Sequence, residues 1–346
     1  MLLIIFGAGA SFDHDKFSTT KHGYPKLPLA NDLINKNLYF VKEAMTKWTG
    51  AVPLLNRLNE LKDLQKGLFD LEDALFSEFQ RNNDAVKGQL LSFQFYVHDI
   101  IRSCEQEVRS YNQGNTNYTR LLDILQQKSI DQNKGICLVT FNYDTLLDTA
   151  CSQIYPDWEF TDFDDYITGC TVVRLYKPHG SLSWKQSHDT RHQPSRVSTV
   201  KILQHPTQFG LTARVQQIQG YELPHSQFIT GSNYVSSPIL AIPYKQKTGF
   251  VFPENHRNAL IHDMEKISHI LTVGWRGAEK HFQQEILGKI PESNQVKILN
   301  VNMGSKHIEN NLKEFLDKKI LKIDTYSLGF TKFLEDRSVL EKFLTA

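Results

Sequence analysis

The stretch LVTFNYDTLLD, residues 138–148, brings polar side chains into an apolar setting. Thr140, Asn142 and Asp144 stand at every second position where an apolar strand runs into a leucine-rich helix. Because side chains alternate along a strand, this spacing places the hydroxyl, the carboxamide and the carboxylate on one face. Asn142 and Asp144 are also residue types that cap helices, here one beginning near Leu146. One of the two suffices as a cap, so the pair indicates a recognition surface.

A second polar turn follows another apolar run, in LYKPHGSLSW at 175–184. It contains His179 beside Gly180. Histidine is the side chain best suited to exchange a proton near neutral pH, which favours a role as general acid or base. A lone histidine is more often structural than catalytic. Its place in a second strand-end turn adds weight to the catalytic interpretation.

A glycine-rich turn, 7–11, follows the first apolar run directly. Gly7 and Gly9 would let backbone N–H groups approach a pyrophosphate closely, as in dinucleotide-binding folds. The third glycine of the usual fingerprint is missing, because position 12 is Phe. A tight turn between strand and helix, without any ligand, explains this motif equally well.

Two further strand-end turns carry small or polar residues. LTVGWRGAEKHF at 271–282 has Gly274 and Gly277, and ILNVNMGS at 298–305 has Asn300 and Asn302. Four such junctions at one edge of a sheet would be able to grip both ends of an extended dinucleotide. The alternative is that α/β proteins need small residues at these turns whether or not they bind a ligand.

The elements that must position these residues are short apolar runs. Most are continuous rather than alternating, as in strands buried on both faces of a parallel sheet. Helical patterns lie between several of them, which predicts an α/β fold with a doubly wound parallel sheet. The runs occupy 2–6, 136–141, 172–176, 239–242, 269–273, 296–300 and 321–325.

Two segments interrupt this alternation of predicted strands and helices. Leucines at helical spacing fill the first, which we interpret as a helical insertion at about 33–130. The second, at about 185–237, is rich in His, Gln, Ser, Thr and Pro and is expected to be an irregular insertion. The prediction is one domain, 1–346, with these two insertions.

Composition excludes several function classes. With 39 basic and 38 acidic residues, no direct nucleic-acid binding is predicted from net charge. No run approaches the eighteen or so apolar residues of a membrane span, so no membrane association and a cytoplasmic location are expected. The four cysteines form no CxxC pair, which argues against a structural zinc site and a disulfide framework, and no metal is expected.

Taken together, the junctions resemble the sirtuin (silent information regulator) family, and more closely its bacterial NAD-cleaving branch in anti-phage defence. The matched positions are Gly7, Ala8, Gly9 and Ser11 in the glycine loop, Thr140, Asn142 and Asp144 after the second strand, and His179 with Gly180. Gly274 is similar to the glycine that approaches the second ribose, and Asn300 to the asparagine on the adenosine side. The resemblance implies a Rossmann-like, sirtuin-type NAD-binding fold.

The sequence also departs from the protein deacylases of that family. Phe141 stands where sirtuins have a glutamine that helps hold the ribose, and the paired-cysteine zinc module is absent. LPLAND at 27–32 stands in place of the usual cofactor loop. KPHGSLSW at 177–184 and VGWRGAE at 273–279 instead look like the sirtuin-like effectors that deplete cellular NAD.

The resemblance therefore implies an NAD glycohydrolase, a hydrolase with NAD as its substrate, acting in antiviral defence by abortive infection. In that interpretation Asn142 positions water and a ribose hydroxyl, His179 is the general base, and Asp144 holds the nicotinamide amide. The glycine loop holds the pyrophosphate. Regulation is expected through a homo-oligomer or a separately encoded activator, such as a helicase-type ATPase or an Argonaute-like sensor.

Two alternatives remain beside it. A non-catalytic module that binds NAD or ADP-ribose would keep the glycine loop and tolerate loss of His179. A protein deacylase would depend on an acylated peptide, and the missing zinc cysteines disfavour it.

Overall fold

The computed structural model describes residues 1–16, 25–81, 84–128, 135–189, 212–217, 234–242, 250–303 and 307–345. The chain divides into two compact units. Unit 1 comprises Met1–Leu27, Glu105–His179 and Gln246–Ala346, and unit 2 comprises Pro28–Cys104 and Gly180–Lys245. Every candidate site residue named above lies in unit 1, apart from Gly180.

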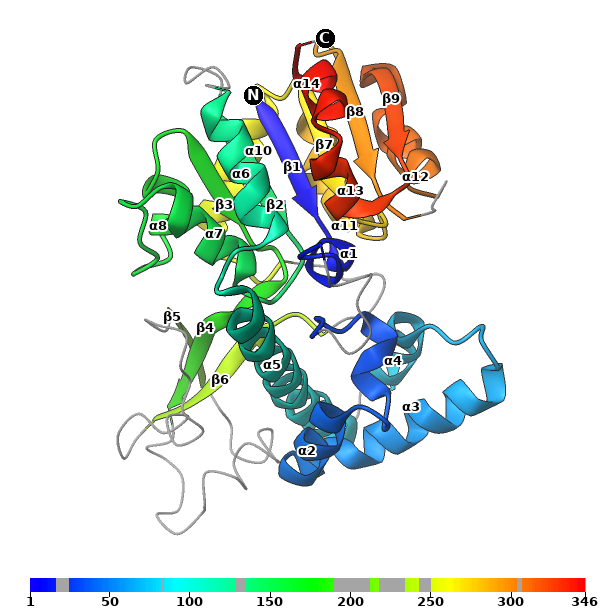
Figure 1. Ribbon diagram of the computed structural model, residues 1–346. Coiled ribbons are helices and arrows are strands. Elements are labelled where there is room, and N and C mark those ends of the chain that lie inside the picture. The colour runs from blue at the N-terminus through cyan, green and yellow to red at the C-terminus, as the bar shows by residue number, and fades with distance from the viewer. Residues whose placement is uncertain are drawn as a thin grey trace. The chain divides into compact units, whose positions relative to one another are not determined.

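Unit 1 is built on a six-stranded sheet whose paired strands all run parallel. The spatial order is β3-β2-β1-β7-β8-β9 (Figure 1). This order, with the chain winding outward from β1 and then outward again from β7, confirms the predicted doubly wound α/β sheet. The strands are β1 (Leu2–Phe6), β2 (Ile136–Thr140), β3 (Val173–Tyr176), β7 (His269–Val273), β8 (Val296–Val301) and β9 (Ile320–Tyr326).

Burial explains why the central strands are so apolar. All residues of β1 and β2 are buried, as expected for strands covered on both faces. β9 behaves differently, because it lies at the edge of the sheet and pairs only with β8 among the described strands. None of its residues is fully buried, which is consistent with its more polar sequence.

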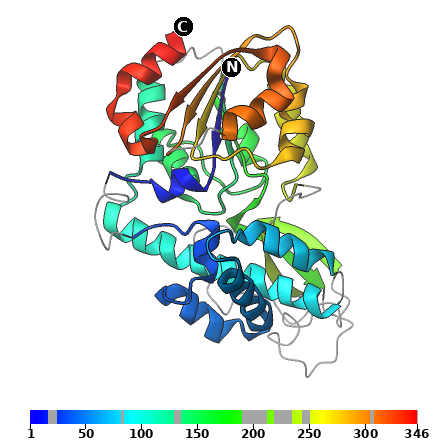
Figure 2. The same ribbon diagram turned by 90° about the vertical axis from the view of Figure 1, so that its right-hand side faces the viewer.

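Helices cover both faces of this sheet (Figure 2). On one face lie α6 (Asn117–Gln127), α13 (Gly329–Glu335) and α14 (Arg337–Thr345), with α7 (Leu146–Ile154) packed beside α6. On the other lie α10 (Glu254–Met264), α11 (Lys280–Glu285) and α12 (His307–Leu316). Short elements complete the unit: α1 (Ala8–Phe12), α8 (Asp165–Thr168) and 3₁₀ turns at Leu287–Lys289 and Asp317–Lys319.

Unit 2 combines helices with a small antiparallel sheet ordered β5-β4-β6. Trp48 stacks on Phe95, and Asp99 accepts hydrogen bonds from the Trp48 indole and from Lys47, which joins α2 to α5. The elements are α2 (Tyr39–Lys47), α3 (Val52–Gln65), α4 (Leu71–Gln80), most of α5 (Asp84–Asn112), β4 (Gly180–Asp189), β5 (Thr212–Gln217), β6 (Tyr234–Leu240) and 3₁₀ turns at Ala30–Ile34 and Thr49–Ala51.

One predicted strand belongs to a different sheet. The run at 239–242 was expected in the parallel sheet, but its first two residues form the end of β6, which pairs antiparallel with β4. Lys177, Pro178 and His179 alone connect β3 to β4, and a parallel crossover needs a dozen residues or more. The chain therefore leaves the parallel sheet after β3, and β6 follows β4 out of it.

The predicted insertions stay predictions. Helices α2 to α6 fall within 33–130, the 3₁₀ turn Ala30–Ile34 lies at its border, and α6 groups with unit 1. Most of the segment 185–237 lies outside the described residues. Within the described part of the chain, no helix has the length and apolar character required to cross a bilayer.

Candidate functional site

The candidate site lies where the winding of the sheet reverses. From β1 the chain proceeds to β2 and β3 on one side, and from β7 to β8 and β9 on the other. In open α/β sheets, ligands bind at the carboxyl ends of the strands beside this switch point. The glycine turn follows β1, Gly274 follows β7, and the turn with Asn142 and Asp144 follows β2.

The glycines make a close backbone contact at the switch point. A Cβ on Gly7 would lie 2.6 Å from the carbonyl oxygen of Gly274, and a Cβ on Gly274 would lie 2.2 Å from the Ala10 nitrogen. Gly274 also has φ +59°, which glycine adopts without strain. The Gly7 and Gly9 N–H groups donate to the carbonyls of Val273 and Gly274 at 3.0 and 3.1 Å. These glycines thus lock two turns together, whereas Ala8 is exposed.

Ser11 contacts two other predicted site residues and a tyrosine. Its hydroxyl donates to Asp144 Oδ2 at 2.7 Å and accepts from Asn142 Nδ2 at 2.8 Å. It also lies 2.8 Å from the hydroxyl of Tyr118, on α6. All four side chains are buried. The structure therefore brings together residues that are more than a hundred positions apart in the sequence.

The neighbours of Asn142 fix its orientation. Its Nδ2 donates to the backbone carbonyl of Gly7 at 2.9 Å, and a carbonyl oxygen only accepts hydrogen bonds. The backbone N–H of Asn142 donates to Thr140 Oγ1 at 3.1 Å. Among the described residues no hydrogen bond reaches Asn142 Oδ1. This oxygen is a preoriented acceptor for a hydroxyl group or a water molecule.

Asp144 serves as a helix cap and as a member of this cluster. Its Oδ1 accepts the N–H of Leu146, at the start of α7, at 3.2 Å, while Oδ2 accepts from Ser11. Burial, reinforced by the negative charge of Glu105, raises the pKa of the Asp144 carboxyl from 3.8 to about 6. Lys177 and the hydrogen bonds oppose that rise. The carboxyl thus titrates much nearer neutrality than an exposed aspartate.

A second group of residues, which the sequence analysis did not identify, holds the same turn from α5. Glu105 accepts from the backbone N–H and the hydroxyl of Thr145 at 2.9 and 2.6 Å. Arg109 pairs with Glu105 at 2.7 Å and donates to the Thr145 carbonyl at 3.0 Å. Glu and Arg four positions apart on a helix are a common surface pair, so the sequence carried no signal of this buried role.

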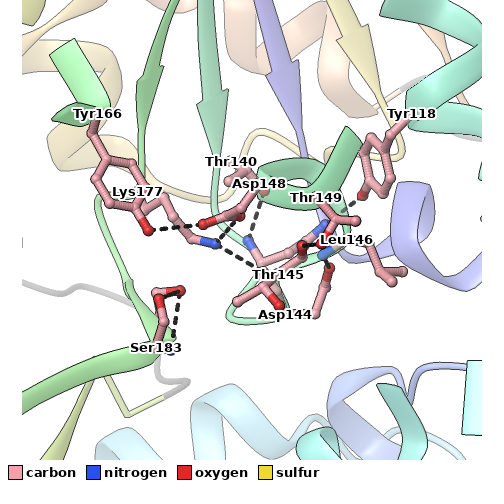
Figure 3. Close-up of polar contacts among 12 residues, drawn as sticks. Tyr118, Thr140, Asp144, Thr145, Leu146, Asp148, Thr149, Tyr166, Lys177 and Ser183 are labelled. Atoms are coloured by element: carbon pink, nitrogen blue, oxygen red, sulfur yellow. Dashed lines mark hydrogen bonds and ion pairs between the residues drawn. The ribbon is translucent and has the colours of Figure 1, made fainter. Parts of the chain in front are cut away.

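Lys177 was also missed. It is fully buried, and its Nζ donates to Asp148 Oδ2 at 2.7 Å and to the Asp144 carbonyl at 2.8 Å (Figure 3). The hydroxyl of Tyr166 donates to the other oxygen of Asp148 at 2.9 Å. A lysine directly after an apolar run, with an aspartate inside the apolar helix pattern of α7, is the signal that would have found the pair.

His179 lies among aromatic rings. Its ring is 4.8 Å from Phe141, 6.5 Å from Tyr143 and 6.4 Å from His281, measured between centroids. Phe141 in turn stacks on Trp275 at 5.8 Å. Phe141 therefore supports His179 by packing, in the place where the resemblance expects a ribose-binding glutamine.

Asn300 lies apart from the Ser11 cluster, within β8. It is fully buried, and its Oδ1 accepts from the hydroxyl of Thr272 on β7 at 2.9 Å. Its Nδ2 has no hydrogen-bond partner among the described residues. A buried amide donor without a partner is costly, which suits a position completed by water or a ligand. No cluster of three or more potential metal-ligating side chains occurs in the described residues.

Comparisons with known proteins gave matches among solved structures. No protein-family model matches the chain, and no curated protein matches it. A mutant Sir2 homologue in complex with 2′-O-acetyl ADP ribose is 11% identical, with a TM-score of 0.47, over 99% of this chain and 93% of that one. A Sir2 complex with a p53 peptide and NAD+ is 12% identical, with a TM-score of 0.43, over 100% and 94%. Sir2Tm bound to a propionylated peptide is 12% identical, with a TM-score of 0.39, over 99% and 92%.

Proposed function

We propose that this protein is an NAD glycohydrolase, which cleaves NAD+ to nicotinamide and ADP-ribose. The observation that carries the proposal is the buried cluster of Ser11, Asn142 and Asp144 at the switch point of a doubly wound sheet. The order of motifs along the chain, which resembles the NAD-cleaving sirtuin-like branch, supports it.

The reaction sets three requirements. The bond between the nicotinamide nitrogen and ribose C1 breaks, and its electron pair stays on the nicotinamide ring as the group leaves. Positive charge then builds on the ribose in an oxocarbenium-like transition state, to which water adds at C1 while a base takes one proton. The enzyme must hold the leaving group, stabilise the charge and present the water.

Asn142 is suited to present the water. Its Nδ2 is held by the Gly7 carbonyl and Ser11, so Oδ1 keeps one direction before any substrate binds. A preoriented acceptor reduces the entropy lost on reaching the transition state. In this role Oδ1 accepts a hydrogen bond from the attacking water or from a ribose hydroxyl.

Asp144 supplies negative charge to the same place. With a pKa of about 6, its carboxyl is mostly ionised at neutral pH. The carboxylate would accept a hydrogen bond from the nicotinamide amide, and its charge favours the oxocarbenium-like state electrostatically. Ser11, by donating to Oδ2, holds the carboxylate oriented.

His179 is proposed as the general base that takes the proton from water. Its ring is packed by Phe141, which limits its rotation. Gly7, Ala8, Gly9 and Ser11 are proposed to lie along the pyrophosphate, Thr140 beneath the ribose, and Gly274 and Asn300 toward the adenosine end. The unpartnered Nδ2 of Asn300 is a donor for that end of the substrate.

The physiological role we propose is a regulated effector of bacterial anti-phage defence that depletes NAD. An unregulated enzyme of this kind would kill its own cell. Regulation is proposed to come through assembly into a homo-oligomer or through a separately encoded activator.

The test is nicotinamide release from NAD+ by the purified protein at several protein concentrations, with NAD+ binding measured in the same samples. His179→Ala and Asn142→Ala are compared with His262→Ala and Asn37→Ala, which change exposed residues of the same types. Turnover by the wild type and both controls, with binding but no turnover in the site variants, supports the proposal. Equal binding without turnover in all five proteins, at every concentration, is the result expected of a non-catalytic binding module or of an enzyme that awaits its activator, and the search then moves to what activates it.

A further inference from the structure

A lysine without access to water lies directly beneath the candidate site. Lys177 is 0% exposed, and its partner Asp148 is 2% exposed. Lysines are almost never buried to this degree unless they are paired. The pair is complete: Nζ reaches Asp148 Oδ2 at 2.7 Å, and the hydroxyl of Tyr166 satisfies the second oxygen at 2.9 Å.

The same ammonium makes one further contact, and it is with the site. Nζ donates to the backbone carbonyl of Asp144 at 2.8 Å (Figure 3). That carbonyl belongs to the turn 141–145, which carries Asn142 and the Asp144 side chain. Lys177 itself lies two positions before His179. One cation therefore connects the turn after β2, the helix α7 through Asp148, and the strand whose end leads to His179.

We infer that Lys177 is a positioning residue of the candidate site, which fixes the turn 141–145 relative to His179 by holding the Asp144 carbonyl. Its effect on turnover rests on the proposed function. Its effect on the turn does not, because the contacts are those of the protein alone.

Stability does not account for this lysine. Burying two charges costs desolvation, and well-packed neutral residues often replace a buried ion pair without loss of stability. A neutral pair, however, leaves the Asp144 carbonyl without its charged donor. The stability of the fold and the position of the turn can therefore be separated by substitution.

The positive charge of Lys177 also favours the proposed reaction, through its effect on the pKa of Asp144. Three ionisable groups from different elements interact with Asp144: Glu105 of α5, Tyr118 of α6 and Lys177 after β3, and Asp148 of α7 is paired with Lys177. Of these, Lys177 lowers the pKa of the Asp144 carboxyl, against burial and Glu105, which raise it. The lysine thereby favours the carboxylate form that the proposed reaction uses.

The decisive variant is the double substitution Lys177→Met with Asp148→Asn. It leaves neither member of the Lys177–Asp148 pair as a lone charge, because Asp148→Asn removes the negative charge while keeping an oxygen that accepts from Tyr166. The single variants Lys177→Met and Lys177→Arg accompany it. Lys177→Met alone leaves Asp148 unpaired and is expected to fold poorly, whereas Lys177→Arg keeps the charge and is expected to restore part of the function.

The chain offers a control ion pair on β3, the strand that leads directly to Lys177. Arg174 pairs with Asp263 at 2.5 Å, and the hydroxyl of Tyr176 donates to the second oxygen of Asp263 at 2.8 Å. This triad repeats the cation, aspartate and tyrosine of the Lys177 group, but the aspartate lies in α10 rather than in α7. Arg174→Met with Asp263→Asn therefore removes an ion pair of the same kind from β3, one whose cation is partly exposed rather than buried.

Two readouts test the inference. The first is amide hydrogen exchange in residues 141–146, where the N–H groups of Asn142, Thr145 and Leu146 donate to side chains. The second is kcat and KM for NAD+ cleavage. We expect exchange in this segment to accelerate at least ~10-fold in the Lys177→Met/Asp148→Asn protein. We expect its kcat to fall by ~10²-fold with little change in KM, as for a small displacement of reacting groups.

The outcomes separate the inference from the proposed function. Wild-type exchange in the double variant overturns the inference, and so does accelerated exchange with wild-type kcat. The same changes in the Arg174→Met/Asp263→Asn control would also overturn it, because any ion pair of β3 would then have the same effect. If the wild type releases no nicotinamide, no kcat can be compared, and the exchange measurement alone decides whether Lys177 positions the turn.

Discussion

The two sides of the candidate site are held in place by different forces. On one side, Ser11, Asn142 and Asp144 are fixed by directional hydrogen bonds among buried polar groups. On the other, His179 is surrounded by aromatic rings, with Phe141 at 4.8 Å. Hydrogen-bonded groups lose their arrangement when one partner is removed, whereas packed rings tolerate a change of shape at modest cost. Substitutions on the two sides should therefore have distinguishable effects.

The largest effect is expected from the histidine itself. His179→Ala should lower kcat for NAD+ cleavage by ~10²–10⁴-fold, the usual loss when a positioned general base is removed. Binding of NAD+ should change little, because the residues proposed to contact the pyrophosphate and adenosine follow or lie on other strands. Nicotinamide release and calorimetric binding to the same preparation measure both quantities. A variant with unchanged kcat would remove His179 from the mechanism.

On the polar side, Asp144 gives the fold a distinct pH dependence. Because its pKa is raised from 3.8 to about 6, the folded state binds the proton more tightly than the unfolded state does. This group's contribution to the free energy of unfolding therefore falls as pH rises from about 4 to about 6, by on the order of 3 kcal/mol, and is constant above that. Urea unfolding of the wild type and of Asp144→Asn between pH 4 and 7 measures how much of the pH dependence of the free energy of unfolding comes from Asp144. Parallel curves for the two proteins would contradict the raised pKa.

Removing the Ser11 hydroxyl tests the hydrogen-bond network, with a smaller expected effect. Ser11→Ala leaves Asp144 Oδ2 and the Tyr118 hydroxyl each without one partner. We expect the free energy of unfolding to fall by about 1–3 kcal/mol, the cost of leaving buried polar groups unsatisfied. Ser110→Ala, which changes an exposed hydroxyl on α5, is the control and should stay within about 0.5 kcal/mol. Equal stability of the two variants would argue against a cooperative network.

The smallest effect is expected on the aromatic side. Phe141→Leu keeps an apolar side chain beside His179 and Trp275 but removes the ring contacts. We expect the free energy of unfolding to fall by about 1–1.5 kcal/mol, and kcat to fall only a few-fold. Thermal unfolding and initial rates measure the two. A loss of kcat as large as that of His179→Ala would show that the ring positions the base more strictly than packing alone explains.

The sequence was sufficient to predict the sheet but not every strand in it. Continuous apolar runs such as 2–6 and 136–141 indicated strands buried on both faces, and all residues of β1 and β2 are buried. The run at 239–242 looked the same, yet it pairs with β4 in the antiparallel sheet. Periodicity reports burial, and burial does not specify which sheet a strand joins.

For the site, the residue types were visible and their partners were not. Asn142 and Asp144 stood out because polar groups followed a buried strand. Their shared contact with Ser11 spans 131 and 133 positions of sequence, which no local pattern reveals. Lys177 and Asp148 each stand in an apolar stretch, which signals burial, but their pairing spans 29 positions of sequence and is not visible locally.

The contact between Gly7, Gly9 and Gly274 has a consequence for how this chain varies. Any replacement adds a Cβ, and at each of the three positions that atom would meet backbone within 3.0 Å. Backbone atoms cannot move out of the way by a change of rotamer, as side-chain atoms can, so only glycine fits at these three positions. A saturation library of the gene, selected only for folded protein, should therefore contain no substituted clones at these three codons, although the first two lie far from the third in the sequence.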